Sequence, residues 1–121
     1  MDRAERDFRK LLVWQKAHAL AVLTYKETTS FPRDERYGLT SQARRAAVSV
    51  PANIAEGCGR SGETELARYM TIAQGSASEL DYYFTLATDL CYWPQAKAYE
   101  LGMQIDEVKR MLSAYISRLK S

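Results

Sequence analysis

The residues that could carry out chemistry are few and scattered along the 121-residue chain. His18 is the only histidine, and the positions three and four residues away from it hold no carboxylate. A catalytic imidazole needs a partner that orients it, and a lone histidine on a helix is far more often a structural or surface group. We therefore predict no catalytic residue, and we expect that the protein is not an enzyme.

Paired carboxylates are the next candidates for a catalytic or metal-binding site. Di-metal sites in helical bundles use Glu-x-x-His motifs on facing helices. The corresponding segments here, which begin at Glu56 and Glu79, read EGCG and ELDY and contain no histidine. We predict no metal site and no cofactor. Instead, we expect Glu56 and Glu79 to pair with Arg45 in a partly dry cleft, where such a network fixes register more than it adds stability.

The glycine-rich segment Gly57–Gly62 could contact phosphate, since it leads into the N-terminus of a predicted helix. It lacks the spacing and the Lys-Ser/Thr pair of a P-loop, and no strand precedes it. A plain turn between helices is the favoured interpretation. Cys58, flanked by two glycines, is expected to be exposed, but no base lies near it that could activate a nucleophile.

Basic residues suggest a binding role. Four arginines lie near the two ends and the outer face of the second predicted helix, namely Arg33, Arg36, Arg44 and Arg60. Such a patch could hold the backbone of RNA or DNA without reading its bases. A solvated charged surface is the alternative. Aromatic stacking residues are not interleaved with the arginines, so sequence-specific recognition of single strands is not indicated.

The elements that position these residues are helices. Helical spacing recurs throughout and no segment alternates as a strand would. We predict helices over residues 12–29, 34–56, 62–90 and 94–119, separated by short loops that favour antiparallel neighbours. The expected fold is all-α: an up-down-up-down antiparallel four-helix bundle in which residues 1–121 form a single domain.

The second predicted helix carries two stripes side by side. One is apolar and rich in alanine, and it allows another helix to approach closely. The other is polar and steps by three or four residues through Gln42, Arg45, Ser49, Asn53, Glu56 and Arg60. Together with Glu79 on the third helix, we expect this stripe to form a structural polar network between helices, in which Gln42, Ser49 and Asn53 contribute hydrogen bonds.

Apolar residues cover more than half the circumference of the third predicted helix, whereas one core needs a stripe of roughly 100°. Monomers seldom expose large apolar patches, so we predict a homo-oligomer. A wide core with partly exposed tyrosines is the alternative. The candidate interface residues are Trp14, Ile72, Tyr82, Tyr83 and Leu86.

Composition sets the broad class. The net charge is +2, and residues 1–60 carry +4 while the remainder carries −2. Two cysteines do not suggest a disulfide scaffold, the N-terminal sequence does not look like a signal peptide, and no apolar run is long enough for a bilayer. We expect a cytoplasmic protein without membrane contact.

Several short segments together point to a family. They are Leu12-Val-Trp-Gln-Lys-Ala17, Phe31-Pro32, Tyr37-Gly-Leu, Ser41-Gln-Ala-Arg-Arg-Ala46, Asn53-Ile-Ala-Glu-Gly57 and Ala73-Gln-Gly-Ser-Ala77 with Glu79. Over about residues 8–119 the chain resembles the bacterial four-helix bundle proteins named for intervening sequences within 23S ribosomal RNA genes. The resemblance implies a homopentameric ring around a central channel. It also implies kinship with accessory proteins of diversity-generating retroelements, which are markedly basic, assist a reverse transcriptase and bind nucleic acid.

Two functions follow from these expectations. In the first, the chain is an accessory protein that binds RNA or DNA backbone beside a nucleic-acid enzyme. In the second, it is an oligomeric scaffold for a protein partner and has no affinity for nucleic acid.

Overall fold

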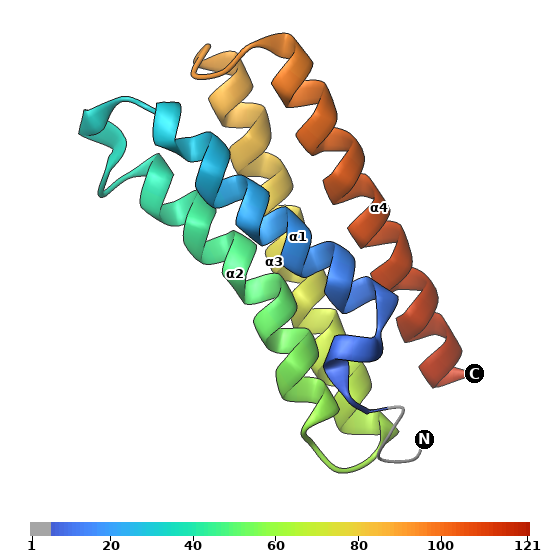
Figure 1. Ribbon diagram of the computed structural model, residues 1–121. Coiled ribbons are helices and arrows are strands. Elements are labelled where there is room, and N and C mark those ends of the chain that lie inside the picture. The colour runs from blue at the N-terminus through green and yellow to red at the C-terminus, as the bar shows by residue number, and fades with distance from the viewer. Residues whose placement is uncertain (1–5) are drawn as a thin grey trace.

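Four long helices make up the computed structural model, which describes residues 6–121. They are α1 (Leu12–Glu27), α2 (Leu39–Cys58), α3 (Glu63–Asp89) and α4 (Gln95–Lys120), with the short 3-10 turns η1 (Phe8–Lys10), η2 (Thr28–Ser30) and η3 (Arg33–Glu35). No strand occurs among the described residues. Consecutive helices run in opposite directions (Figure 1). The all-α four-helix bundle is therefore confirmed, while residues 1–5 of the expected domain lie outside the described part.

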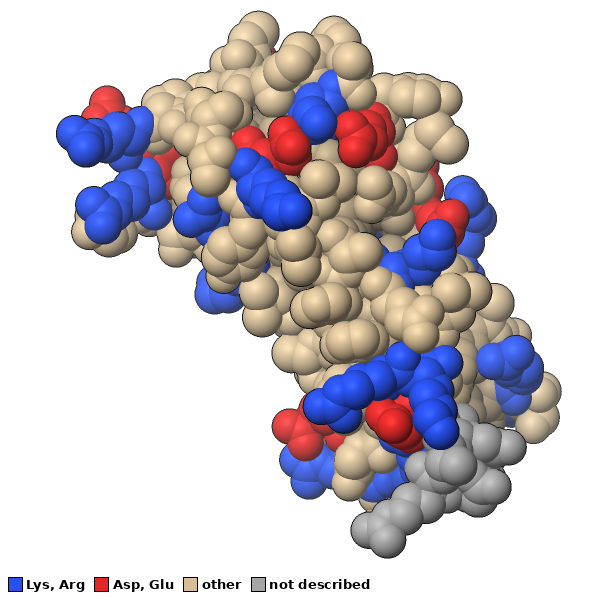
Figure 2. Space-filling model, viewed as in Figure 1, with Lys and Arg blue, Asp and Glu red and all other residues tan. Residues whose placement is uncertain are grey.

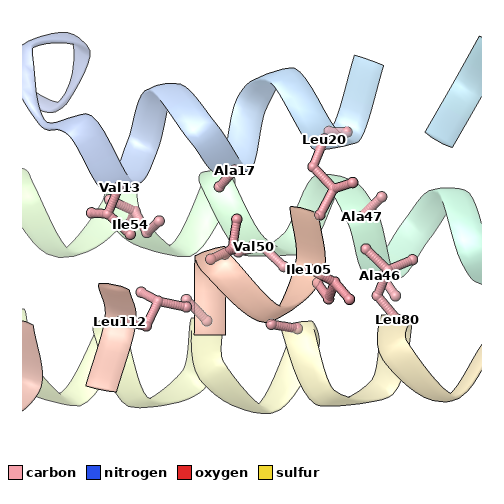
Figure 3. Close-up of a cluster of buried hydrophobic side chains, with 14 of the residues drawn as sticks. Val13, Ala17, Leu20, Ala46, Ala47, Val50, Ile54, Leu80, Ile105 and Leu112 are labelled. Atoms are coloured by element: carbon pink, nitrogen blue, oxygen red, sulfur yellow. The ribbon is translucent and has the colours of Figure 1, made fainter. Parts of the chain in front are cut away.

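The helices pack as a square. α1 contacts α2 and α4, and α3 contacts the same two helices from the other side. The core lies between them and is built from the apolar faces that the helical spacing produces (Figure 3). Along α2 the buried residues are mainly small, whereas α4 contributes larger ones such as Leu101, Ile105 and Leu112. Small side chains on one helix leave room for large ones on its neighbours.

The start of α2 corrects the predicted range of 34–56. The helix begins at Leu39, because residues 33–35 form the separate turn η3 and Gly38 departs from helical geometry with φ −109° and ψ −116°. The carboxylate of Glu35 accepts a hydrogen bond from the backbone N–H of Leu39 at 3.0 Å. It satisfies one of the donors that a new helix leaves free.

The end of α2 also differs from the expectation. Gly57 was expected in a turn, but it is buried inside the helix, which continues to Cys58. A Cβ atom on Gly57 would lie 2.8 Å from the Cβ of Tyr69 on α3. The glycine therefore serves the close approach of α2 and α3. Cys58 is consequently buried and not exposed.

The predicted interface residues separate into two groups. Trp14, Tyr83 and Leu86 pack partly against the core of their own chain, whereas Ile72 and Tyr82 on α3 stay 40% and 58% exposed. The core is wider than a helical wheel suggests, so α3 exposes less apolar surface than predicted. The described residues form no helix with the length and apolarity needed to cross a membrane.

Candidate functional site

An open hollow of about 560 Å³ lies where the end of α1 meets the beginning of α2. Its lining comes from both helices and from the turn that precedes α2, and consists of Tyr25, Arg36, Tyr37, Thr40, Ser41, Arg44, Arg45 and Val48. Three of these eight residues are arginines and none is acidic. Within residues 6–121, these three arginines form no salt bridge with a carboxylate. The lining of the hollow therefore carries positive charge and no negative charge.

The topology explains why these residues meet. α1 and α2 are antiparallel neighbours joined by a short connection, so the last turn of α1 faces the first turns of α2. On the face shown in Figure 2, Lys and Arg side chains gather toward the two ends of the molecule, and uncharged residues occupy much of the middle. The positive end of the α2 dipole lies at the same end of the bundle as the hollow, and it adds to the attraction for anions.

Arg44 is the most firmly held of the three cations. Its Nε donates a hydrogen bond to the Oγ1 of Thr28 at 2.9 Å, and its Nη2 donates one to the backbone carbonyl of Tyr25 at 3.2 Å. Thr28 is only 1% exposed, and its hydroxyl donates a hydrogen bond to the backbone carbonyl of Thr24 at 2.7 Å. A guanidinium has five N–H donors. These bonds use two of them and leave three for a ligand.

Aromatic rings accompany the arginines, which corrects the prediction that none would. The guanidinium of Arg44 lies 5.0 Å from the ring centre of Tyr25, and that of Arg36 lies 5.4 Å from the ring centre of Tyr37. Tyr25 is 45% exposed and Tyr37 is 85% exposed. Both distances fall within the range of cation–π contacts. The hollow therefore combines cationic groups with accessible ring surfaces.

Arg45 belongs to this hollow as well as to the predicted polar stripe. It donates a hydrogen bond to the amide oxygen of Gln42. The Tyr83 hydroxyl lies 3.4 Å from that amide oxygen and 3.2 Å from a carboxylate oxygen of Glu79. Burial of the ring and the adjacent Glu79 charge raise the pKa of Tyr83. Gln42, Arg45, Tyr83 and Glu79 thus form one cluster across α2 and α3.

The remainder of the predicted polar network is divided. Ser49 and Ser76 lie 2.7 Å apart at the α2–α3 contact, and Asn53 donates to the Ser49 hydroxyl at 3.0 Å. Glu56 instead pairs with Arg60 at 3.2 Å. The expected pairing of Glu56 with Arg45 was wrong. Arg45 and Glu56 are eleven positions apart, which corresponds to about 16 Å along a helix and is beyond the reach of the two side chains.

The four arginines predicted as one patch are also separated. Arg36 and Arg44 line the hollow, and Arg33 is exposed in η3 but is not part of the lining. Arg60 lies at the opposite end of α2, over the ring of Tyr69 at 5.3 Å. There it borders a second open hollow that also contains Arg6.

The second hollow is less suited to bind an anion. Arg6 is engaged by the turn between α2 and α3, because it donates to the carbonyl of Gly62 at 2.7 Å and to that of Arg60. Arg60 is already neutralised by Glu56, and Asp7 forms part of the lining. Cys58, also in the lining, is buried, and this burial raises the pKa of its thiol. A thiol of this kind is a poor nucleophile.

Other reactive groups are not assembled into a site. His18 stacks on Trp14 with ring centres 4.8 Å apart, and the structure gives it no hydrogen bond to a carboxylate within residues 6–121. Over the same range, no three His, Cys, Asp or Glu side chains come together in a way that could hold a metal ion.

Sequence reasoning overlooked Thr28, Tyr25, Tyr37 and the second role of Arg45. A usable signal was present, since an antiparallel helix pair with a short connection brings the last turn of one helix beside the first turns of the next. Tyr25 and Arg44 are nineteen residues apart, but one lies in the last turn of α1 and the other in the second turn of α2. Pairing residues across the loop would have brought the aromatic and basic residues together.

Comparison with known proteins extends the description. The fold is similar to a crystal structure of a protein of unknown function from the S23 ribosomal protein family of Bacteroides thetaiotaomicron. The TM-score is 0.77, the identity is 22%, and the match covers 91% of this chain and all of the other. No curated protein matches the chain. The model of the 23S rRNA-intervening sequence proteins matches residues 9–114, which includes every residue that lines the hollow. The chain therefore belongs to the family of 23S rRNA-intervening sequence proteins.

Proposed function

We propose that this protein is a non-enzymatic accessory protein of the cytoplasm that binds the phosphodiester backbone of nucleic acid through the hollow between α1 and α2. The single observation that carries the proposal is the set of three arginines, Arg36, Arg44 and Arg45, in the lining of one hollow that contains no acidic residue. Guanidinium groups pair well with phosphate because their N–H donors match its oxygens in a planar fork.

The anchoring of Arg44 supports the same function. A side chain that is already held in place loses less conformational entropy on binding than a freely moving one. The bonds to Thr28 and to the carbonyl of Tyr25 hold the guanidinium at the edge of the hollow, and they leave three N–H donors for phosphate oxygens. The contacts are to the backbone of the nucleic acid, so base sequence has little influence on them.

Salt dependence tests the proposal. Binding of a fluorescein-labelled duplex is measured by anisotropy at several salt concentrations. Each phosphate contacted contributes about −0.9 to the slope of log K against log salt. We expect Arg44→Gln to weaken binding and to reduce the slope by about 0.9 per subunit. The matched control is Arg110→Gln, which removes an exposed arginine on α4 that is not part of the hollow.

Two outcomes would contradict the proposal. One is wild-type protein that binds no nucleic acid at low salt. The other is an equal loss for Arg44→Gln and Arg110→Gln, which would mean that general charge is responsible. Capture of a specific protein partner from nuclease-treated lysate, with no nucleic-acid binding, would favour the protein scaffold instead.

We further propose that several copies assemble into a ring, with five as the number implied by the family resemblance. The exposed face of α3 supports this assembly. Ile72, Gly75 and Tyr82 lie on one side of the helix, and nothing lies within 4 Å of the position that a Cβ of Gly75 would occupy. A glycine there costs about 1 kcal/mol in helix propensity, and a close contact with a second copy would offset it.

Sedimentation velocity at micromolar concentration tests the assembly. We expect wild-type protein to sediment as an oligomer and Tyr82→Arg to sediment as a smaller species, because a charge would be buried in the contact. Val22→Arg serves as the control, since Val22 is similarly exposed but lies on α1. If the wild type sediments as a single subunit, the proposed assembly is contradicted. The nucleic-acid proposal does not depend on this result and is tested by the salt dependence of binding.

A further inference from the structure

The exposed tyrosines of the hollow are not explained by backbone binding alone. Tyr37 is 85% exposed in the turn before α2, and the structure gives its hydroxyl no hydrogen-bond partner among the described residues. Tyr25 is 45% exposed on the last turns of α1. Neither ring is needed to fill the core, and neither is needed to attract phosphate. Their placement in the lining of the arginine hollow calls for a ligand with flat, apolar surfaces as well as negative charge.

We propose that the hollow binds single-stranded nucleic acid, with unpaired bases stacked on Tyr37 and Tyr25 while Arg36, Arg44 and Arg45 contact the intervening phosphates. This inference rests on the proposed function and specifies the class of nucleic acid. Stacking of this kind does not select a base sequence, so it agrees with the expectation that single strands are not recognised sequence-specifically.

The argument begins with the rings. Base–aromatic stacking contributes about 1–3 kcal/mol per base in proteins that bind single strands, and it tolerates any base because every base has a π-face. In a duplex these faces are covered by neighbouring base pairs. An exposed tyrosine ring therefore gains this contact only from a strand whose bases are unpaired.

The arrangement of charges supports the same ligand. Each ring has a guanidinium within 5.4 Å of its centre, so the hollow places an aromatic surface beside a phosphate-binding group twice. A single strand likewise presents a base next to each phosphate. An acidic peptide would satisfy the arginines, but its carboxylate side chains would make no use of the ring faces.

The arginines also orient the rings. A guanidinium over one face of Tyr37 leaves the opposite face available, and the ring is held by the turn that Glu35 fixes through its bond to the N–H of Leu39. The hydroxyl of Tyr92 donates to the same carboxylate at 2.7 Å, and these hydrogen bonds lower the pKa of Glu35. The turn that presents Tyr37 is thus tied to the distant loop before α4.

Fluorescence anisotropy with four probes tests the inference. They are an oligothymidine strand of about 15 nucleotides, the corresponding oligouridine strand, an abasic strand with the same phosphates, and a DNA duplex of equal length. We expect wild-type protein to bind the oligothymidine strand at least about 25-fold more tightly than the abasic strand, which corresponds to two stacked bases at the lower limit of about 1 kcal/mol each. The oligouridine arm shows whether RNA and DNA are bound alike.

Substitutions then assign the effect to the rings. Tyr37→Ala and Tyr25→Ala should each weaken binding to the oligothymidine strand at least fivefold and leave the abasic strand and the duplex unaffected. Tyr37→Phe, which keeps the ring, should bind like wild type. Tyr99→Ala is the matched control, because Tyr99 is 71% exposed on α4 and is not part of the hollow. Circular dichroism verifies that each variant is folded.

The outcomes separate this inference from the function on which it rests. Equal affinity for the intact and the abasic strand, or unchanged affinity of Tyr37→Ala and Tyr25→Ala, would overturn the stacking inference and leave backbone binding standing. Absence of binding to all four probes would overturn both. Displacement of the strand by polyglutamate at equal charge concentration would show that charge alone is recognised, and it would also overturn the inference.

Discussion

The contact between α2 and α3 at Gly57 gives a prediction whose sign can be worked out from the structure. In Gly57→Ala the new Cβ would lie 2.8 Å from the Cβ of Tyr69, 3.2 Å from the Cδ1 of Leu66 and 3.4 Å from the carbonyl oxygen of Leu66. The Cβ of Tyr69 is bonded directly to the backbone, and the carbonyl oxygen of Leu66 is part of the backbone. Neither atom can rotate away, so the steric clash can be relieved only if one helix shifts.

The magnitude follows from two opposing effects. Aliphatic carbons pack best at about 3.5–4.0 Å, so the helices must separate by roughly 0.7 Å or more at this point. Such overpacking costs about 1–3 kcal/mol, and alanine recovers about 1 kcal/mol in helix propensity. With a cost near the middle of that range, we expect a net loss of about 1 kcal/mol. In a chain of 121 residues this lowers Tm by about 4 °C.

Gly102→Ala supplies the matched control. Gly102 lies inside α4, and nothing lies within 4 Å of the position that its Cβ would take. Only the propensity effect remains, so we expect Tm to rise by about 4 °C. Gly75→Ala should behave in the same way in an isolated subunit, but it should lose stability or dissociate if copies pack against that face of α3.

Thermal unfolding followed by far-ultraviolet circular dichroism measures all three variants. The decisive comparison is between Gly57→Ala and Gly102→Ala, which carry the same chemical change and should differ by about 8 °C. A Tm for Gly57→Ala at or above the wild-type value would refute the close approach of α2 and α3. The account of this glycine as a packing residue would then be wrong.

Three further predictions concern the hollow and the titratable groups. Thr28→Val should lower the free energy of unfolding by about 1 kcal/mol, as measured by chemical denaturation. It should weaken nucleic-acid binding less than Arg44→Gln does, because the substitution frees the guanidinium of Arg44 without removing it. Hydrogen bonds lower the pKa of Glu35. They stabilise the protein above the ordinary carboxyl pKa of about 4.3 and are lost at lower pH. Below that pH the Tm of the wild type should therefore fall more steeply than that of Glu35→Gln. With a thiol reagent, exposed Cys91 should react at once and buried Cys58 only on unfolding.

The sequence predicted the regular parts of the fold closely. The bounds of α3 and α4 lie within one residue of the expected ranges, because long periodic segments with glycine or proline at their ends leave little freedom. The start of α2 was missed by five residues. Residues 34–36 look like the acidic first turn of a helix, and the bond between Glu35 and Tyr92, which are 57 residues apart, is tertiary and invisible in the local sequence.

The candidate site was predicted less well, for a related reason. Arg36 and Arg44 were found from charge alone, whereas Arg60 was included although it lies at the other end of the helix. The rings of Tyr25 and Tyr37 were overlooked, although Tyr37 directly follows Arg36 in the sequence, because the contact of Tyr25 with Arg44 forms only when α1 packs against α2. Residues brought together by packing between helices are the part that local patterns do not encode.

The two hydrogen bonds of Arg44 to α1 have a consequence for dynamics. The guanidinium that faces the hollow also secures the final turn of α1, since it is bonded to Thr28 and to the carbonyl of Tyr25. Occupancy of the hollow is thereby coupled to fraying of that turn. A ligand that immobilises the guanidinium should slow amide hydrogen exchange in η2, which it need not touch, and Arg44→Gln should abolish that protection.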